Sequence, residues 1–306
     1  MNKLLAALAF LLFFQLLSAQ AGARDLEQEI YRVETVGGDI FIGTLVQEDD
    51  EQIILRIENV GVLTMQRINI KQMSQIDPGR IRDGEYWFVN PQPTRFYFAP
   101  NAFGLQKGKG YYQNTLLFFN NVNYGITDRF SVGGGLAPLF LLGASETPLW
   151  VLPKISVPLA NDKVHLAAGA MLGGLLGTRG DAESRFLGLV YGLGTIGTYD
   201  NNLSLGAGFG YQGRDFSSKP VINFSGMTRT GVRFYLITEN YLFWTGQSEF
   251  RDGATVTRDV LTGIVSLGIR WAPENFAVDF YLARPLEETG EFIAFPLLGV
   301  TIPFGR

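Results

Sequence analysis

From residue 94 onward the chain alternates apolar with small or polar residues in long stretches. Leu203, Leu205 and Phe209 share one parity, while serine and glycine fill most positions between them. Residues 261–271 and 276–283 alternate in a similar way. Because successive side chains of a strand point to opposite faces, each stretch has one apolar face and one small, polar face. The pattern predicts β-strands of about 10 to 16 residues, which is the roughly 9–11 residues that a membrane-spanning strand needs plus some overhang.

These stretches and their links predict a closed barrel of about 12 antiparallel strands. The predicted strands cover residues 94–103, 111–125, 130–140, 148–159, 163–177, 185–199, 202–213, 219–228, 231–245, 256–271, 275–285 and 292–304. The links alternate between long and short, as in outer-membrane barrels, which have short periplasmic turns and longer outer loops. Because the first link is long, both ends of the barrel are expected on the short-turn, periplasmic side.

The first residues have the features of a secretory signal peptide. Lys3 supplies a positive charge, residues 4–17 form an apolar run, and Ala19 and Ala21 fit a small-residue cleavage site. An uncleaved membrane anchor is the alternative, but the run is shorter than the roughly 20 residues that a spanning helix needs. We therefore expect residues 1–21 to be a signal peptide and the mature protein to be exported.

Residues 26–77 have a different pattern, with short runs of β-branched residues between glycine and aspartate turns. Such runs predict a compact β-domain. Residues 38–45 and 53–55, separated by a charged turn, resemble the SH3-like and Sm-like small barrels. An Sm-like relationship would imply RNA binding, but the export signal and the acidic turn at 48–51 are inconsistent with that role.

The hairpin at 122–133 resembles one found in uncharacterised Gram-negative outer-membrane β-barrel proteins, and the last strand, which ends at Phe304, is amphipathic. Residues 78–93 contain Pro and Gly pairs and are predicted to be a linker. The predicted fold is therefore all-β, with a small SH3-like or Sm-like domain followed by a transmembrane β-barrel of about 12 strands at 94–306. The resemblance implies a location in the cell outer membrane, with the N-terminal domain in the periplasm.

Composition narrows the classes of function. The formal net charge is −4 and charged residues make up 18%, so there is no broad basic surface and no nucleic-acid partner is expected. The 37 glycines and 13% aromatic residues suit a barrel that faces lipid. The chain has no cysteine and one histidine, which excludes disulfides, thiolate chemistry and a multi-histidine metal site. No metal and no cofactor are expected.

Ionisable residues with inward parity are the candidate functional residues. They are predicted to line the lumen, and they are Lys154, His165, Arg233, Glu239, Arg270 and Asp279. Charges of mixed sign inside a barrel either pair across the lumen or set the field of a pore, and the sequence leaves both open.

Two other patterns are assigned to strands rather than to chemistry. Residues 192–197 and 208–213 match the dinucleotide-binding fingerprint, but no helix is predicted to begin at either match, as that site requires. His165 has Ser156 on the preceding predicted strand, yet a hydrolase needs the two groups to meet and an orienting partner. No catalytic or cofactor-binding residue is therefore predicted.

Aromatic residues near predicted strand ends are expected to form girdles at the membrane interfaces, with loop packing as the alternative. They are Tyr97, Tyr111, Tyr112, Tyr124, Trp150, Tyr199, Tyr241, Trp244 and Trp271.

The patterns taken together favour a passive channel or a structural membrane component without enzymatic activity. Its partners would be outer-membrane lipid and, for the N-terminal docking domain, a periplasmic protein or the cell wall. Two alternatives stay open. One is an outer-membrane barrel hydrolase that acts on lipid or peptide, and the other is a secreted, soluble β-sandwich binding protein. The pattern leaves the solute and the oligomeric state open.

Overall fold

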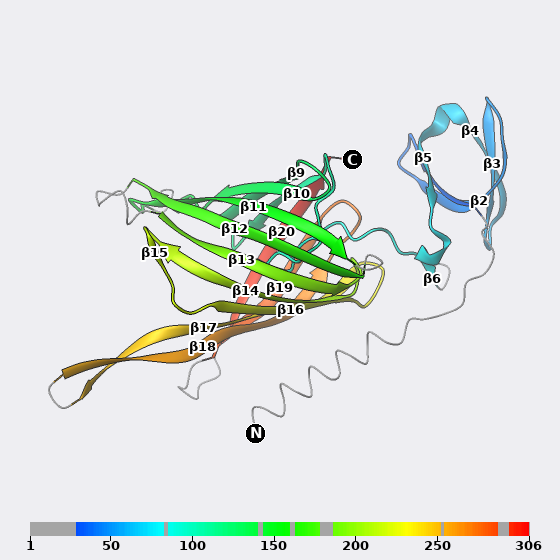
Figure 1. Cartoon of the computed structure of the whole chain (residues 1–306). Coiled ribbons are helices and arrows are strands. Elements are labelled where there is room, and N and C mark those ends of the chain that lie inside the picture. The colour runs from blue at the N-terminus through cyan, green and yellow to red at the C-terminus, as the bar shows by residue number, and fades with distance from the viewer. Residues whose placement is uncertain are drawn as a thin grey trace, which may run out of the picture. The chain divides into compact units, whose positions relative to one another are not determined.

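The computed structural model describes residues 29–82, 85–139, 143–159, 163–177, 186–251, 254–286 and 294–305. The predicted signal peptide, residues 1–21, lies outside the described residues. The chain forms two compact units, Met1–Val89 and Asn90–Arg306 (Figure 1). Among the described residues, no helix is long and apolar enough to cross a membrane.

The first unit contains an antiparallel sheet of five strands in the order β4-β3-β2-β1-β5. The strands are β1 (Ile30–Thr35), β2 (Ile40–Glu48), β3 (Gln52–Ile57), β4 (Gly61–Gln66) and β5 (Ile70–Ile76). Alternation along β3 buries Ile53 and Leu55 completely, and they pack with Val33 and Met65 in a small core. Gly43 lets β2 curve onto β3, because a Cβ there would lie 2.5 Å from the backbone oxygen of Arg56. The resemblance of this sheet to SH3-like barrels stays a prediction.

A short connection follows this sheet. It consists of the 3-10 turn η2 (Pro78–Arg80) and a two-stranded hairpin of β6 (Ile81–Arg82) and β7 (Glu85–Tyr86).

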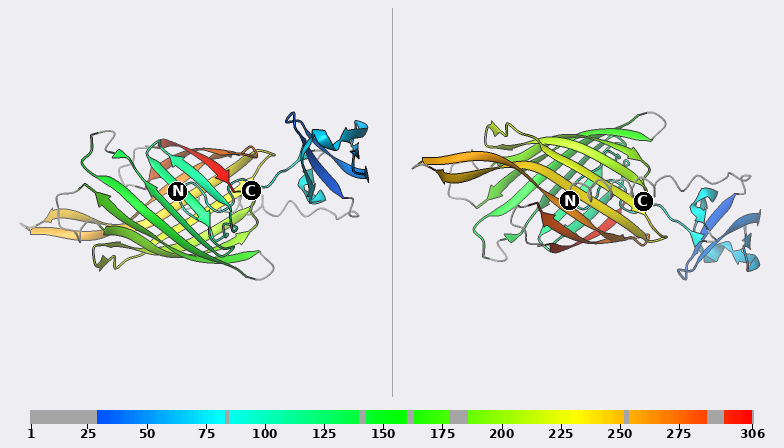
Figure 2. Two further views of the ribbon diagram at one scale, coloured as in Figure 1. Left: turned by 90° about the horizontal axis from the view of Figure 1, so that it is seen from above. Right: turned by 90° about the horizontal axis from the view of Figure 1, so that it is seen from below.

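The second unit is a closed antiparallel barrel (Figure 2). Its sheet has 13 strands, of which the two-residue β15 (Asp215–Phe216) pairs with β14 alone, so 13 − 1 = 12 strands form the ring. The pairs β8–β20 and β13–β14 close it. The ring strands are β8 (Gly110–Thr115), β9 (Phe119–Gly125), β10 (Phe130–Leu136), β11 (Thr147–Leu159), β12 (Val164–Leu176), β13 (Phe186–Gly197), β14 (Asn202–Gln212), β16 (Val221–Arg229), β17 (Phe234–Arg251), β18 (Ala254–Trp271), β19 (Ala277–Pro285) and β20 (Phe295–Phe304). The predicted barrel of about 12 strands is confirmed.

Two strand predictions were wrong in compensating ways. Residues 94–103 form no strand. Side chains at both odd and even positions of this stretch are buried, as Phe96 and Tyr97 show. Alternation cannot distinguish such a segment from one that faces lipid. Residues 111–125 form two strands, β8 and β9, joined by a tight turn in which Leu116 and Leu117 adopt positive φ. That turn has none of the glycine, proline, asparagine or aspartate residues that normally mark one.

Most links sort by length onto the two ends of the barrel. The tight turn at 116–118 is an exception, because it joins β8 to β9 at the end where the longer links lie. Short turns at 126–129, 198–201, 230–233 and 272–276 lie at one end. At the other end, longer links follow β10, β12, β14 and β19, and the hairpin of β17 and β18 extends outward there (Figure 1). Because β8 begins and β20 ends at the short-turn end, both ends of the barrel lie there, as the sequence predicted.

The buried leucine of β3 is expected to dominate the stability of the first unit. Leu55→Ala should lower its free energy of unfolding by about 2–5 kcal/mol, since the surrounding side chains cannot fill the cavity completely. The matched change Val62→Ala, at a side chain that is 64% exposed, should cost less than about 0.5 kcal/mol. Hydrogen exchange of β1 to β5 in the full chain measures both. Equal effects would contradict this core.

Candidate functional site

The lumen contains a segment of the chain that precedes the first barrel strand. We call residues 90–104 the plug. The plug folds back on itself, since the Asn101 amide donates to the Thr94 carbonyl at 3.1 Å and the Asn101 side chain donates to Pro93 O at 2.7 Å. Its start lies at the short-turn end, where Asn90 donates to Tyr199 O at 2.9 Å. The predicted linker, residues 78–93, therefore ends inside the barrel.

A carboxylate from β17 holds the tip of the plug. Glu239, only 2% exposed, accepts hydrogen bonds from the backbone amides of Tyr97, Phe98 and Ala99 at 2.7, 3.0 and 3.1 Å. The Tyr241 hydroxyl donates to its other oxygen at 2.7 Å. Successive amides that converge on one anion form a nest, and such bonds offset the cost of removing a carboxylate from water.

A buried ion pair binds the carbonyls of the plug. Arg270 donates to both carboxylate oxygens of Asp279, at 2.6 and 3.0 Å. The rest of its guanidinium donates to Phe96 O at 2.7 Å and Gln92 O at 3.1 Å. Arg270 is fully buried, and its planar fork serves the ion pair and the plug backbone together.

The returning arm of the plug has its own contacts. Lys154 of β11 donates to Asn101 O at 3.1 Å and to Phe103 O at 2.9 Å. The Ala102 amide between them donates to the Thr195 hydroxyl at 2.8 Å. The sequence analysis missed Thr195, because a neutral inward residue does not stand out among the many serines and threonines of the strands.

An apolar cluster packs around the same segment. Phe96 and Tyr97 contact inward residues of β16, β17 and β19, among them Met227, Ile237 and Tyr281. The rings of Tyr97 and Tyr281 stack with centroids 3.7 Å apart. Burial, and then the nearby Asp279 carboxylate, raise the pKa of Tyr97, so its hydroxyl stays protonated and donates to Ile237 O at 2.8 Å.

Four of the candidate lumen residues, Lys154, Glu239, Arg270 and Asp279, thus surround the plug. His165 faces the lumen near the short-turn end, and its ring packs edge-on against Phe103 with centroids 4.7 Å apart.

The inward assignment of Arg233 was wrong. The strand β17 begins at Phe234, so Arg233 lies exposed in the preceding turn, where strand parity does not hold. The buried inward arginine of this region is Arg229, which pairs with Asp200 at 3.1 Å.

A cavity of about 430 Å³ at the short-turn end is lined by Ser156 and His165, together with Asp128. The hydroxyl oxygen of Ser156 is buried and has no hydrogen-bond partner among the described residues. A serine nucleophile requires a hydrogen bond to its base, and that bond is not formed. Among the residues that the structure describes, no group of three acidic, histidine or cysteine side chains is placed to hold a metal ion.

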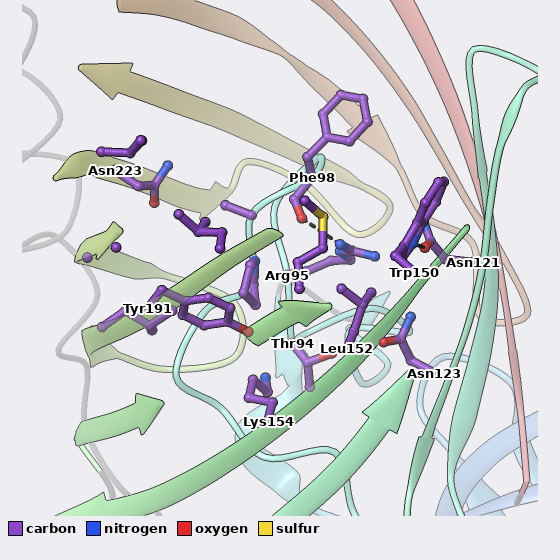
Figure 3. Close-up of a pocket in the computed structure, with 18 of the residues that line it drawn as sticks. Thr94, Arg95, Phe98, Asn121, Asn123, Trp150, Leu152, Lys154, Tyr191 and Asn223 are labelled. Carbon is purple, nitrogen blue, oxygen red and sulfur yellow. Dashed lines mark hydrogen bonds between the residues drawn. The ribbon is translucent and has the colours of Figure 1, made fainter. Parts of the chain in front are cut away.

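A second cavity, of about 460 Å³, occupies the lumen beyond the plug, toward the end with the longer links. Figure 3 shows Arg95 in its middle, with Lys154, Asn123 and Trp150 around it. Much of its wall is apolar, in contrast to the small, polar inner face that the sequence predicted. The apolar side chains include Leu152, Met171, Leu187, Leu189 and Leu193.

The glycine fingerprints lie on the adjacent strands β13 and β14, and no helix begins at either. Several expected girdle aromatics instead lie in the lumen. Tyr97 and Tyr111 are buried, and Trp150 and Tyr241 line the cavity beyond the plug. Strand parity places Tyr111, Trp150 and Tyr241 in the lumen, and Tyr97 lies there as part of the plug.

No protein-family model and no curated protein matches the chain. Among solved structures, a KdgM porin is 8% identical with a TM-score of 0.43, and the match covers 65% of this chain and 99% of the porin. A loop-deletion mutant of OmpT, an outer membrane protein of Vibrio cholerae, is 10% identical with a TM-score of 0.34, covering 90% and 97%. TM-scores this low do not establish a shared fold, so the barrel assignment depends on the strand pairing described above.

The Glu239 contacts can be tested with a single introduced thiol, since the chain has no cysteine. Ala99→Cys, at a position that is 5% exposed, should react slowly with a water-soluble maleimide. Adding Glu239→Ala should speed labelling at least about tenfold, because each buried amide left unpaired costs about 1–3 kcal/mol. Glu239→Gln keeps one acceptor and should fall between the two. Identical labelling rates in all three proteins would contradict a plug held by Glu239.

Proposed function

We propose that this chain is an outer-membrane β-barrel whose lumen is closed by its own plug. The observation that carries the proposal is the outward face of the ring, which is apolar on nearly every strand. Leu205, Leu267 and Phe280 on three different strands are 64%, 56% and 49% exposed. Further exposed apolar side chains are Val122, Ile155, Leu166, Leu172, Val190, Phe209, Ile269, Leu282, Leu298 and Ile302. A soluble monomer rarely exposes so extended an apolar surface, whereas a lipid-facing barrel requires one.

Aromatic side chains at the short-turn end support a membrane interface there. Tyr124, Phe234, Trp271 and Phe304 end or begin their strands at that end, and each is between 39% and 48% exposed. Such residues concentrate at the boundary between lipid and water. We assign this end to the periplasm, since outer-membrane barrels have their short turns on that side. The first unit would then be a periplasmic domain with a protein or the cell wall as its partner.

The plug favours a gated channel over an open passive one. Its side chains and backbone are hydrogen bonded to the wall of the lumen, with one cavity on its short-turn side and another on the side of the longer links. The alternatives receive less support. A soluble sandwich would have two separate sheets where this chain has a closed ring, and a hydrolase lacks the bond between Ser156 and a base.

Membrane insertion is tested by fractionation. The mature chain expressed with its export signal should sediment with outer membranes and should need detergent for extraction. Release by carbonate or by salt alone would overturn the membrane assignment. Leu205→Asp, which puts a charge on the outward face, should reduce insertion, while Lys219→Ala, at a loop residue whose side chain is 39% exposed, should have no effect.

Gating is tested by conductance in a planar bilayer. The wild-type barrel should conduct little, and replacement of residues 95–100 by two glycines should raise the conductance several-fold. The replacement keeps Thr94 and Asn101, whose hydrogen bond closes the base of the plug tip. A folded barrel that stays silent without the tip would reject the channel and leave a structural role. High conductance of the wild type would show that the plug does not close the lumen.

A further inference from the structure

The cavity beyond the plug has one apolar wall and a cationic floor. Its volume of about 460 Å³ lies within the range of roughly 300–1,000 Å³ that is typical of small-molecule sites. Leucine side chains of β13, among them Leu187, Leu189 and Leu193, form the apolar wall, although they point into the barrel and away from lipid. The opposite wall, from β9, carries Asn121 and Asn123.

The cations at the floor have neutral partners. Arg95 of the plug donates to the Gln113 side chain and to Phe98 O. Lys154 donates to two plug carbonyls. The acidic groups nearby are already engaged, since Glu239 binds plug amides and Asp279 pairs with Arg270. Two buried cationic side chains without a counter-anion favour the binding of an anion.

Two donors at this floor lack a hydrogen-bond partner among the described residues. They are the Nε of Arg95, a side chain of a residue only 6% exposed, and the Nδ2 of Asn123. Both residues line the cavity, as Lys154 does (Figure 3). Buried donors are nearly always satisfied, so these two indicate where an acceptor would bind.

We propose that this cavity binds a single-chain amphipathic anion, such as a long-chain carboxylate. Its head would accept from Arg95 and Asn123, and its chain would lie against the leucine wall of β13. This site does not depend on conduction, because the plug that closes the lumen also provides the floor. The test of ligand binding and the test of conductance can therefore fail independently of each other.

Trp150 provides the readout, since its indole lines the cavity and donates to Asn121. Dibromostearate, whose bromines quench tryptophan on contact, should quench the full-length barrel in a saturable manner. Trp150→Phe should remove the saturable component, while quenching of the other tryptophans through bulk lipid should remain. The absence of a saturable component in the wild type would overturn the proposal.

Competition identifies the chemistry of the head group. Stearate should displace the probe, and octadecanol should bind about tenfold more weakly or worse, because a charged hydrogen bond is replaced by a neutral one. Octadecyl phosphate should compete like stearate if the floor accepts any anionic head, and more weakly if it fits a carboxylate. Equal affinity for the acid and the alcohol would overturn the anion site.

Variants connect this selectivity to the named donors. Arg95→Met should remove the preference for stearate over octadecanol. Since Arg95 also contacts the plug, Asn123→Ala is the cleaner change, because it removes a donor without a partner and should weaken stearate binding by about two- to tenfold. Asn114→Ala, on the outer face of β8, is the matched control and should have no effect. Unchanged stearate affinity in both cavity variants would overturn the proposed head-group position.

Discussion

A polar group that is removed from water needs a partner within the protein, and this constraint explains both the wall of the barrel and its contents. The backbone meets it by closure, since β8 pairs with β20 and β13 with β14, which leaves the ring without a free edge. The same constraint acts on the buried ionisable side chains of the lumen. Glu239 and Arg270 would be costly there alone, and the plug backbone satisfies them.

The relation between wall and plug is reciprocal. The plug has little regular secondary structure, so its own amides and carbonyls would remain unpaired in a closed lumen. A carboxylate placed opposite successive amides and a guanidinium opposite carbonyls satisfy both sides at once. Apolar packing of Phe96 and Tyr97 then fixes the segment in one position. The inward charges and the plug depend on each other. The sequence positions of the charges alone therefore did not decide whether they pair within the lumen or set the field of a pore.

The parts of the fold that could be predicted are those governed by a two-residue period. Outward positions such as Leu205 and Leu267 lie where alternation placed them, and the links at the short-turn end were recognisable from their length. The plug could not be predicted, because a segment buried on all sides has no solvent face to break its apolar pattern. The apolar inner wall of β13 was missed for a related reason. Leu189 faces the lumen and Val190 faces outward. Because the residues on the two faces of β13 are similarly hydrophobic, their pattern does not show which face is inside.

Both arms of the plug meet the short-turn end of the barrel. Asn90 bonds to Tyr199 where the segment enters, and Phe103 packs against the same residue where it leaves, with ring centroids 4.8 Å apart. The plug is thus a loop that enters and leaves the barrel at the same end, and the chain does not pass through the barrel. The chain therefore need not be threaded, and strand closure and lumen filling can occur in either order during assembly. Withdrawal would leave every strand pair of the ring intact.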